Sequence, residues 1–208
     1  MCITAIVWGA TFIAQKTGME TIGPMGFTFA RYLIGAGVIL PFALYEAKQV
    51  NLLDALKKDP KLNYAAVGLG LMMFGGIGLQ QTALLFTNVA NAAFLTALYV
   101  PLVPLIAAFC LRRHVPLNIW PAVLLSMAGS YLLSGTSSLD AQFGDLLIIG
   151  GAFFWAGHIL LIQHALEKIA APFQLSVYQS LVTAIVAGVI MVPLESPQLA
   201  DFLPMWPQ

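Results

Sequence analysis

Residues 89–111 read VANAAFLTALYVPLVPLIAAFCL, a stretch without a single Asp, Glu, Lys or Arg. A helix needs about 20 mostly apolar residues to cross the hydrocarbon core of a bilayer. This stretch is long enough, and Arg112 and Arg113 follow it directly. Its prolines, Pro101 and Pro104, are tolerated in membrane helices when neighbouring groups satisfy the freed carbonyls. The stretch therefore predicts a transmembrane helix.

The composition of the whole chain agrees with this stretch. Of 208 residues, 60% are hydrophobic and only 9% are charged, whereas an average soluble domain is about 25% charged. The charge is too low for the surface of a soluble enzyme, and the chain is too apolar to be disordered. Nine Lys and Arg balance nine Asp and Glu, so no basic patch indicates nucleic acid. We expect an all-α integral membrane protein.

Similar stretches occur on both sides of residues 89–111 and predict a bundle of about seven transmembrane helices. They lie near residues 1–17, 26–45, 64–86, 89–111, 118–134, 146–166 and 174–194. Glycines crowd the third of them, and small residues let helix backbones approach closely in a membrane. The first span begins at Met1 without a lead, and a proline-rich loop follows the last. We therefore expect the sequence to be cut at both ends.

The positive charges indicate the orientation of the spans. The links after the second, fourth and sixth spans carry most of them, namely Lys48, Lys57, Lys58, Lys61, Arg112, Arg113 and Lys168. The links after the third and fifth spans and the C-terminal tail carry no Lys or Arg. Cytoplasmic loops are enriched in these residues. We expect the Lys-bearing links to be cytoplasmic, which leaves Lys16 and Arg31 toward the outer side.

An internal echo relates the first and sixth spans. The segment Trp8-Gly-Ala-Thr11 precedes Pro24 much as Trp155-Ala-Gly-His158 precedes Pro172. The sixth span comes five spans after the first, and five is odd, so the second copy enters the membrane from the opposite side. Inverted repeats of this kind are typical of secondary carriers, whose halves rock about a central site.

Short motifs follow one another along the spans in a fixed order. They are Val7-Trp8-Gly9-Ala10-Thr11-Phe12, Pro24 with Phe27 and Ala30-Arg31-Tyr32, Leu79-Gln80-Gln81-Thr82-Ala83-Leu84, Asn91-Ala92-Ala93-Phe94-Leu95-Thr96, Tyr99-Val100-Pro101-Leu102 and Gly129-Ser130-Tyr131-Leu132-Leu133. In these motifs the chain resembles the EamA-type family of the drug/metabolite transporter superfamily. The resemblance covers essentially the whole chain.

The resemblance implies ten transmembrane helices in two inverted five-helix repeats, which export or take up small metabolites such as amino acids or related compounds. Residues 1–135 then form the first repeat, without the start of its first helix. Residues 144–208 form an incomplete second repeat, with two helices and an outer loop. The sequence departs from the family by stopping after about seven helices, which puts transport by these residues alone in doubt.

Polar residues on several spans are candidates for binding a substrate. In lipid these groups have no hydrogen-bond partner, so they face other helices or a water-filled cavity. One interpretation is interhelical hydrogen bonding, and the other is a polar cavity with aromatic walls. The candidate substrate-binding residues are Trp8, Thr11, Gln15, Arg31, Gln80, Asn91, Thr96, Tyr99, Trp155 and His158. The seventh span adds Ser176, Gln179, Ser180 and Thr183.

Ionisable residues inside a membrane are functional candidates by default. Arg31 either snorkels to the outer interface or grips a carboxylate of a substrate. His158 is either a ligand of the substrate or a neutral histidine bonded to a neighbouring helix. For Lys16, anchoring at the interface is the favoured interpretation. No Asp or Glu lies deep in a span, so these helices do not indicate a buried proton-carrying carboxylate.

These observations favour a secondary carrier that works by alternating access in a bacterial inner membrane. The alternatives are a non-transporting membrane fragment or scaffold and, less favoured, an intramembrane enzyme. No nucleophile motif, acid pair, metal cluster or phosphate-binding loop is evident, so we expect no catalytic residue, metal or cofactor. The expected partners are a small-molecule substrate and the lipid bilayer, with a homo-oligomer left open and nucleic acid excluded.

Overall fold

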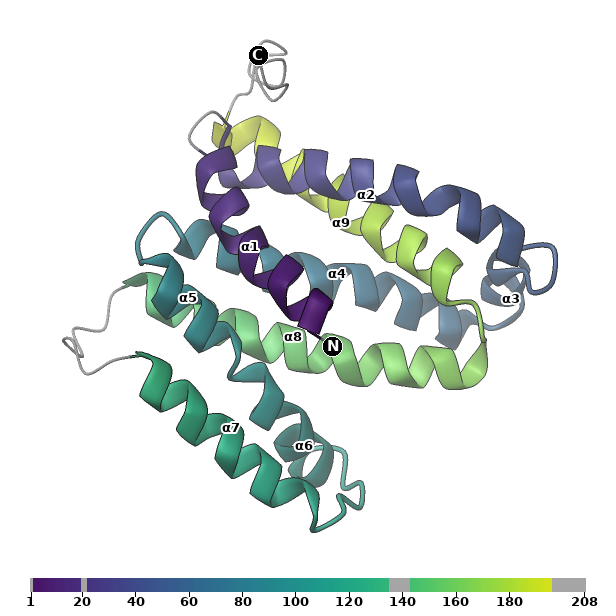
Figure 1. Cartoon of the computed structure of the whole chain (residues 1–208). Helices are drawn as coiled ribbons and strands as arrows, with labels where there is room; N and C mark the ends of the chain where they lie inside the picture. Colours follow the sequence, from purple (N-terminus) through teal and green to yellow (C-terminus); the bar gives the residue numbers. More distant parts are fainter. Residues whose placement is uncertain (1, 20–21, 135–142, 196–208) are drawn as a thin grey trace. The chain divides into compact units, whose positions relative to one another are not determined.

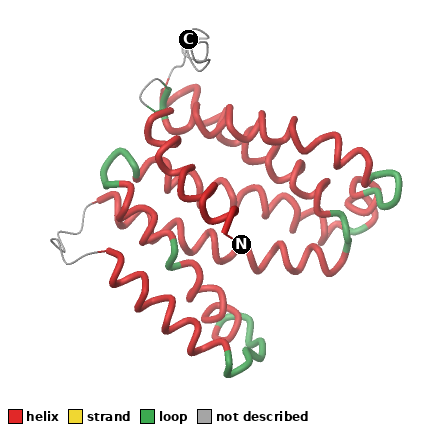
Figure 2. The backbone as a smooth tube through the Cα atoms, viewed as in Figure 1, coloured by secondary structure: helices red, strands yellow, loops and turns green. Residues whose placement is uncertain are grey.

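The computed structural model describes residues 2–19, 22–134 and 143–195 (Figure 1). Figure 2 shows helices joined by loops, and no strand occurs within these ranges. The predicted all-α membrane fold is thereby confirmed. The helices are α1 (Cys2–Gly18), α2 (Pro24–Glu46), α3 (Leu52–Lys58), α4 (Pro60–Ala83), α5 (Val89–Thr96), α6 (Tyr99–Phe109), α7 (Ile119–Ser134), α8 (Phe143–Lys168) and α9 (Pro172–Glu195).

Five stretches of the described chain are helical, long and apolar enough to cross a membrane. They are α2, α4, α8, α9 and the stretch Val89–Phe109, which holds α5 and α6. The first and fifth predicted spans correspond to α1, with 17 residues, and α7, with 16 residues, which are shorter. The count of seven spans therefore remains a prediction, as does the loop expected after the last span, which lies outside the described residues from 196 onward.

The stretch 89–111 is broken where a single helix is predicted. Helix α5 ends at Thr96 and α6 begins at Tyr99. A proline ring clashes with the carbonyl four residues earlier and cannot donate to it. For Pro101 that carbonyl belongs to Ala97, which instead accepts the N–H of Val100 at 3.0 Å. Pro101 therefore explains why the helix turns at this point.

The described helices form two compact units. Unit 1 holds residues 1–21 and 76–157, and unit 2 holds residues 22–75 and 158–208. Helices α4 and α8 each contribute residues to both units. Each unit contains parts of both predicted repeats, 1–135 and 144–208. The two divisions differ because repeats are defined by symmetry, whereas these units are defined by which residues pack together. The repeat boundaries remain predictions.

Unit 2 is built on α2 and α9, which lie side by side (Figure 1). They run antiparallel, since the start of each contacts the end of the other. Ala36, Ala43 and Val177 are buried between them. The short helix α3, which sequence reasoning missed, begins at the cap of Asn51, whose side chain accepts the N–H of Asp54 at 3.2 Å. Its buried Leu52 and Leu56 close one end of the unit 2 core.

The core of unit 1 joins four helices. Phe12 of α1, Ala83 of α4, Ala92 of α5 and Ile148 of α8 are buried in one cluster. Helices α4 and α8 approach closely at Gly76, where an added Cβ would lie 2.9 Å from the Trp155 ring. This contact agrees with the tight packing expected for the glycine-rich third span.

Candidate functional site

Three predicted polar residues meet inside unit 1. Gln15 of α1, Gln80 of α4 and Thr96 of α5 are exposed by 3% or less. The Gln80 amide Nε2 donates to Gln15 Oε1 at 3.2 Å, and Thr96 Oγ1 lies 3.5 Å from Gln80 Oε1. The Thr96 hydroxyl also donates to the Ala92 carbonyl at 2.7 Å. The structure thus joins the first, third and fourth predicted spans through one hydrogen-bonded cluster, which we call the Gln80 cluster.

Gln81 was not among the predicted site residues. Its side chain is fully buried, and neither its amide nitrogen nor its amide oxygen has a hydrogen-bond partner in the part of the chain that the structure describes. Buried polar groups are nearly always paired, and an exception needs an explanation such as a water or a ligand. In the sequence, the two consecutive glutamines in a largely apolar span could have indicated Gln81 as a candidate site residue.

The other candidates in unit 1 are not members of the Gln80 cluster. Thr11, Asn91 and Tyr99 are half-buried, and the N–H of Asn91 donates to Asn88 Oδ1 at 2.8 Å as part of the cap of α5. The half-buried Trp155 packs on Gly76. Trp8 lies in α1, but its side chain is outside the described residues. Substrate binding by these residues stays a prediction.

In unit 2, His158 of α8 is bonded to a neighbouring helix. Its Nε2 lies 2.9 Å from Oε1 of Gln179 on α9, and both side chains are buried. One turn further along α9, the Thr183 hydroxyl donates to the Gly70 carbonyl at 3.0 Å. The structure thus contains the interhelical bond that was one of two interpretations of His158. Within the described ranges, no three His, Cys, Asp or Glu residues are placed to hold a metal ion.

Arg31 of α2 carries a buried guanidinium nitrogen. Its Nη1 has no hydrogen-bond partner among the described residues, and its Cζ lies 5.8 Å from the Tyr32 ring centroid. The carboxylate of Glu195 accepts from the start of the same helix, and both of its oxygens are used there. Arg31 is half-buried, and a buried N–H group without a hydrogen-bond partner is costly. Arg31 therefore retains the capacity to bind an anionic group.

The start of α2 is capped by the last residue of α9. Gly23 has no side chain to cap the helix, and Pro24 has no N–H, so the next two N–H groups need acceptors. The Glu195 carboxylate accepts the N–H of Met25 at 2.7 Å and that of Gly26 at 2.8 Å. An added Cβ on Gly23 would collide with this carboxylate. Glycine at this position therefore leaves room for the carboxylate to reach the two N–H groups.

The start of α9 is capped in the same way by the last residue of α2. Glu46 accepts the N–H of Gln174 at 2.9 Å and that of Phe173 at 3.4 Å. Each glutamate therefore bonds the first and second residues after the proline that begins the other helix, Pro24 or Pro172. The two contacts, which we call the reciprocal carboxylate clamps, are equivalent at the two ends of the antiparallel pair α2 and α9.

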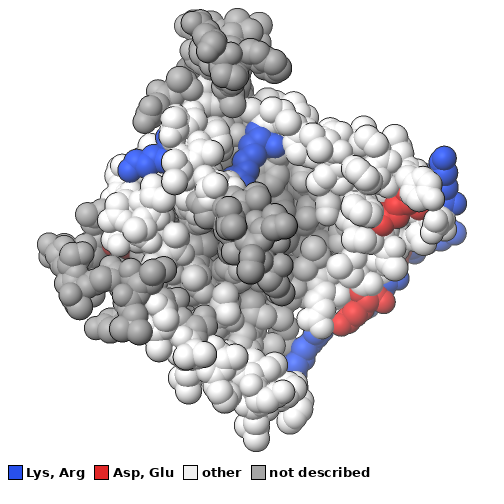
Figure 3. All heavy atoms as spheres, in the orientation of Figure 1, with Lys and Arg blue, Asp and Glu red and all other residues white. Residues whose placement is uncertain are grey.

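The clamp at Glu46 lies in a polar end of unit 2. The Gln174 side chain accepts the N–H of Leu52 at 3.0 Å and donates to the Val50 carbonyl at 2.7 Å. Lys168 and Asp59 form an ion pair at 3.3 Å. Figure 3 shows acidic and basic side chains gathered where α3 lies. This is the end that carries the predicted cytoplasmic link between α2 and α4.

Comparison with known proteins identifies relatives of the chain. Residues 1–135 match the EamA-like transporter family. An uncharacterized transporter of Archaeoglobus fulgidus is 29% identical over 180 residues, which cover 86% of this chain and 53% of the relative. The uncharacterized inner membrane transporter YedA of Escherichia coli K12 is 26% identical, over 95% of this chain and 64% of the relative.

A further relative is the uncharacterized transporter YoaV of Bacillus subtilis, which is 23% identical over 72% of this chain and 51% of its own length. The chain thus spans about half to two thirds of the curated relatives it matches. No solved structure matches it significantly.

Proposed function

Since the chain belongs to the EamA-like transporter family, we propose that it acts in a secondary carrier that moves small metabolites across the inner membrane by alternating access. The expected cargo is amino-acid-like or drug-like. The relatives are named transporters, and one of them an inner membrane transporter, which supports the membrane and the class of activity. Transport moves the solute without changing it chemically.

The reciprocal carboxylate clamps are the observation that carries the mechanism. An inverted repeat places one copy of each helix upside down relative to the other. Such a repeat produces pairs of antiparallel helices with equivalent contacts at equivalent residues. Helices α2 and α9 form such a pair, with equivalent contacts from Glu46 and Glu195. The clamps therefore support two pseudo-symmetric halves, which is the architecture that rocking about a central site requires.

The solute would be bound by polar groups within the helices. The Gln80 cluster and the unpartnered Gln81 amide offer donors and acceptors in unit 1. In unit 2, the Arg31 guanidinium suits a carboxylate, which it can bind through two parallel hydrogen bonds. We also propose that the Lys-bearing end with α3 faces the cytoplasm, in accordance with the distribution of Lys and Arg.

The test is counterflow in liposomes. The protein as it occurs in its native membrane would be reconstituted, loaded with a mixture of unlabelled amino acids and offered the same mixture with a radioactive label. A carrier accumulates label transiently and releases it chemically unchanged. Arg31→Gln should reduce the accumulation, whereas Gln163→Ala, at an exposed position on α8, should not. Chemical conversion of the label, or no accumulation by folded protein with any solute class, would overturn the proposal.

A further inference from the structure

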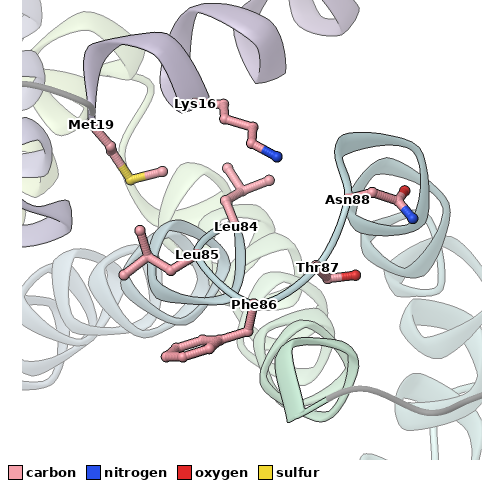
Figure 4. Close-up of a pocket in the computed structure, with 7 residues that line it drawn as sticks. All are labelled: Lys16, Met19, Leu84, Leu85, Phe86, Thr87 and Asn88. Atoms are coloured by element: carbon pink, nitrogen blue, oxygen red, sulfur yellow. The ribbon is translucent and has the colours of Figure 1, made fainter.

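A cavity of about 410 Å³ opens in unit 1 where α1 ends and α4 passes into α5. Figure 4 shows Lys16 reaching from α1 toward the α4–α5 link, with Asn88 across the opening. The cavity is lined by Lys16, Met19, Leu84, Leu85, Phe86, Thr87 and Asn88. Lys16 and Arg31 are the two cations that the sequence places away from the Lys-bearing links. A cation at this end runs against the usual distribution of charge in membrane proteins.

Counting bonds among the described residues, the polar groups of the lining that still have hydrogens to donate are those of Lys16 and Asn88. Asn88 Oδ1 already accepts the N–H of Asn91 at 2.8 Å, which leaves its Nδ2 hydrogens available. The Thr87 hydroxyl donates to Asp145 Oδ1 at 2.7 Å, so its hydrogen is already used. Lys16 forms no ion pair within the described chain. The Lys16 ammonium and the Asn88 amide N–H₂ group together suit a negatively charged ligand with several hydrogen-bond acceptors.

The remaining walls of the cavity are apolar. Leu84 is buried in the unit 1 core, while Leu85 and Phe86 are largely exposed around it. Large apolar side chains at an opening stabilise a ligand by removing apolar surface from water. A ligand that uses both parts of the cavity therefore has a charged group and an apolar body.

We propose that this cavity is a binding site for amphipathic anions, in which a carboxylate or phosphate contacts Lys16 and Asn88 and an apolar body lies against Leu85 and Phe86. The site is separate from the Gln80 cluster and does not depend on transport. The same chemistry occurs in free carboxylic acids and in the head groups of anionic phospholipids. The experiment therefore has one arm for each source.

The first arm measures binding of octanoate to the purified protein in a neutral detergent by calorimetry, with octanamide as the uncharged probe. Lys16→Gln should weaken octanoate binding about twofold to fivefold, as expected for the loss of one exposed ion pair. Lys16→Arg, which keeps the charge, should bind like the wild type. Lys61→Gln is the matched control, because Lys61 is also exposed but lies at the start of α4.

The second arm measures phospholipid retained by the protein, by native mass spectrometry after reconstitution in phosphatidylcholine with phosphatidylglycerol. Lys16→Gln should lose bound phosphatidylglycerol, and Lys61→Gln should not. Loss in the first arm alone assigns the site to free carboxylates, and loss in the second alone assigns it to lipid. If Lys16→Gln, correctly folded by gel filtration, matches the wild type in both arms, or if octanamide binds as well as octanoate and no lipid is lost, the proposal is wrong.

Discussion

Glu46 and Glu195 hold equivalent positions at opposite ends of one helix pair: each accepts the two N–H groups that follow the proline beginning the other helix. A carboxylate at a helix N-terminus gains from the helix dipole as well as from the hydrogen bonds. The pair α2 and α9 is therefore fastened at both ends by charge, in addition to the apolar packing between them.

Removing either carboxylate should destabilise the protein. We expect Glu195→Ala and Glu46→Ala each to lower the free energy of unfolding by about 1–3 kcal/mol, because each leaves backbone donors without a charged acceptor. The measurement is unfolding in mixed micelles with increasing denaturing detergent. Glu167→Ala is the control, since Glu167 is exposed and bonds only Gln163 among the described residues. Equal stability of the Glu195 and Glu167 variants would contradict the clamp.

A side chain at position 23 should weaken the clamp at Glu195. In Gly23→Ala the new Cβ would displace the Glu195 carboxylate, so we expect a loss similar to that of Glu195→Ala. The double variant should be no worse than either single variant, because both remove the same contact. Gly37→Ala is the matched control on α2, where a Cβ meets nothing within 4 Å. It should be neutral or stabilising by up to about 1 kcal/mol. Additive losses in the double variant would count against the shared mechanism.

Gln80 and Gln81 should respond in opposite ways to replacement by leucine. Gln80→Leu leaves Gln15 without its partner and should cost about 1–2 kcal/mol of stability. Gln81→Leu removes an unpaired buried amide and should be neutral or stabilising, while it reduces counterflow if this amide binds solute. The two variants would be compared by unfolding and by counterflow. A strong destabilisation by Gln81→Leu would show that the amide is paired in the folded protein.

His158 and Gln179 should be energetically coupled. Their hydrogen bond joins α8 to α9 inside the membrane, where such bonds are worth about 0.5–2 kcal/mol. A double-mutant cycle with His158→Ala and Gln179→Ala would measure this coupling by unfolding. His164→Ala, at a half-buried position on α8, paired with Gln179→Ala should show none. Absence of coupling for the first pair would favour the other interpretation, in which His158 is a ligand of the substrate.

The ion pair at the Lys-bearing end should make stability depend on pH. Partial desolvation opposes the charged form of Asp59, but hydrogen bonds from Leu62, Lys168 and Lys61 outweigh it and lower the pKa of Asp59 from its ordinary 3.8. A lowered pKa contributes stability above the ordinary pKa, which is lost as the pH falls through the folded value. The stability difference between the wild type and Asp59→Asn should thus be constant near neutral pH and shrink below about pH 4. A difference that grows on acidification would contradict this sign.

Much of the fold follows from local sequence, because a bilayer requires long apolar helices. The predicted stretch 174–194 is α9, Pro172–Glu195, and 26–45 is α2, Pro24–Glu46. Local hydropathy does not indicate where a helix breaks within an apolar stretch. The break before Pro101 leaves the composition of residues 89–111 unchanged, so only the stereochemistry of proline indicates it. The helix α3 was missed because it is short and carries Lys57 and Lys58, like the loop around it.

The candidate site was predictable only in part, for a different reason. Periodicity places Gln15 and Thr96 on particular faces of their helices, but it does not show which helices are neighbours. The Gln80 cluster is therefore evident only in the structure. The clamps join residues more than a hundred positions apart. The sequence echo shows that Pro24 and Pro172 begin matching helices, and Glu46 and Glu195 end the same two helices. The sequence does not show that each glutamate bonds the start of the other helix. A carboxylate used as a cap for a different helix has no local signature.

The reciprocity of the clamps has the form of an isologous interface, in which residue i of one subunit contacts j of the other and j contacts i. One peptide element with a proline at its start and a glutamate at its end satisfies both contacts when two copies associate antiparallel to each other. A dimer of such elements would need no second gene product, provided that its copies insert in opposite directions. Fusion of the copies into one chain preserves the contact and frees each half to diverge. Glu46 and Glu195 would then be the residues of the two halves that diverge least from each other. Substituting one of them alone removes one of the two equivalent helix caps.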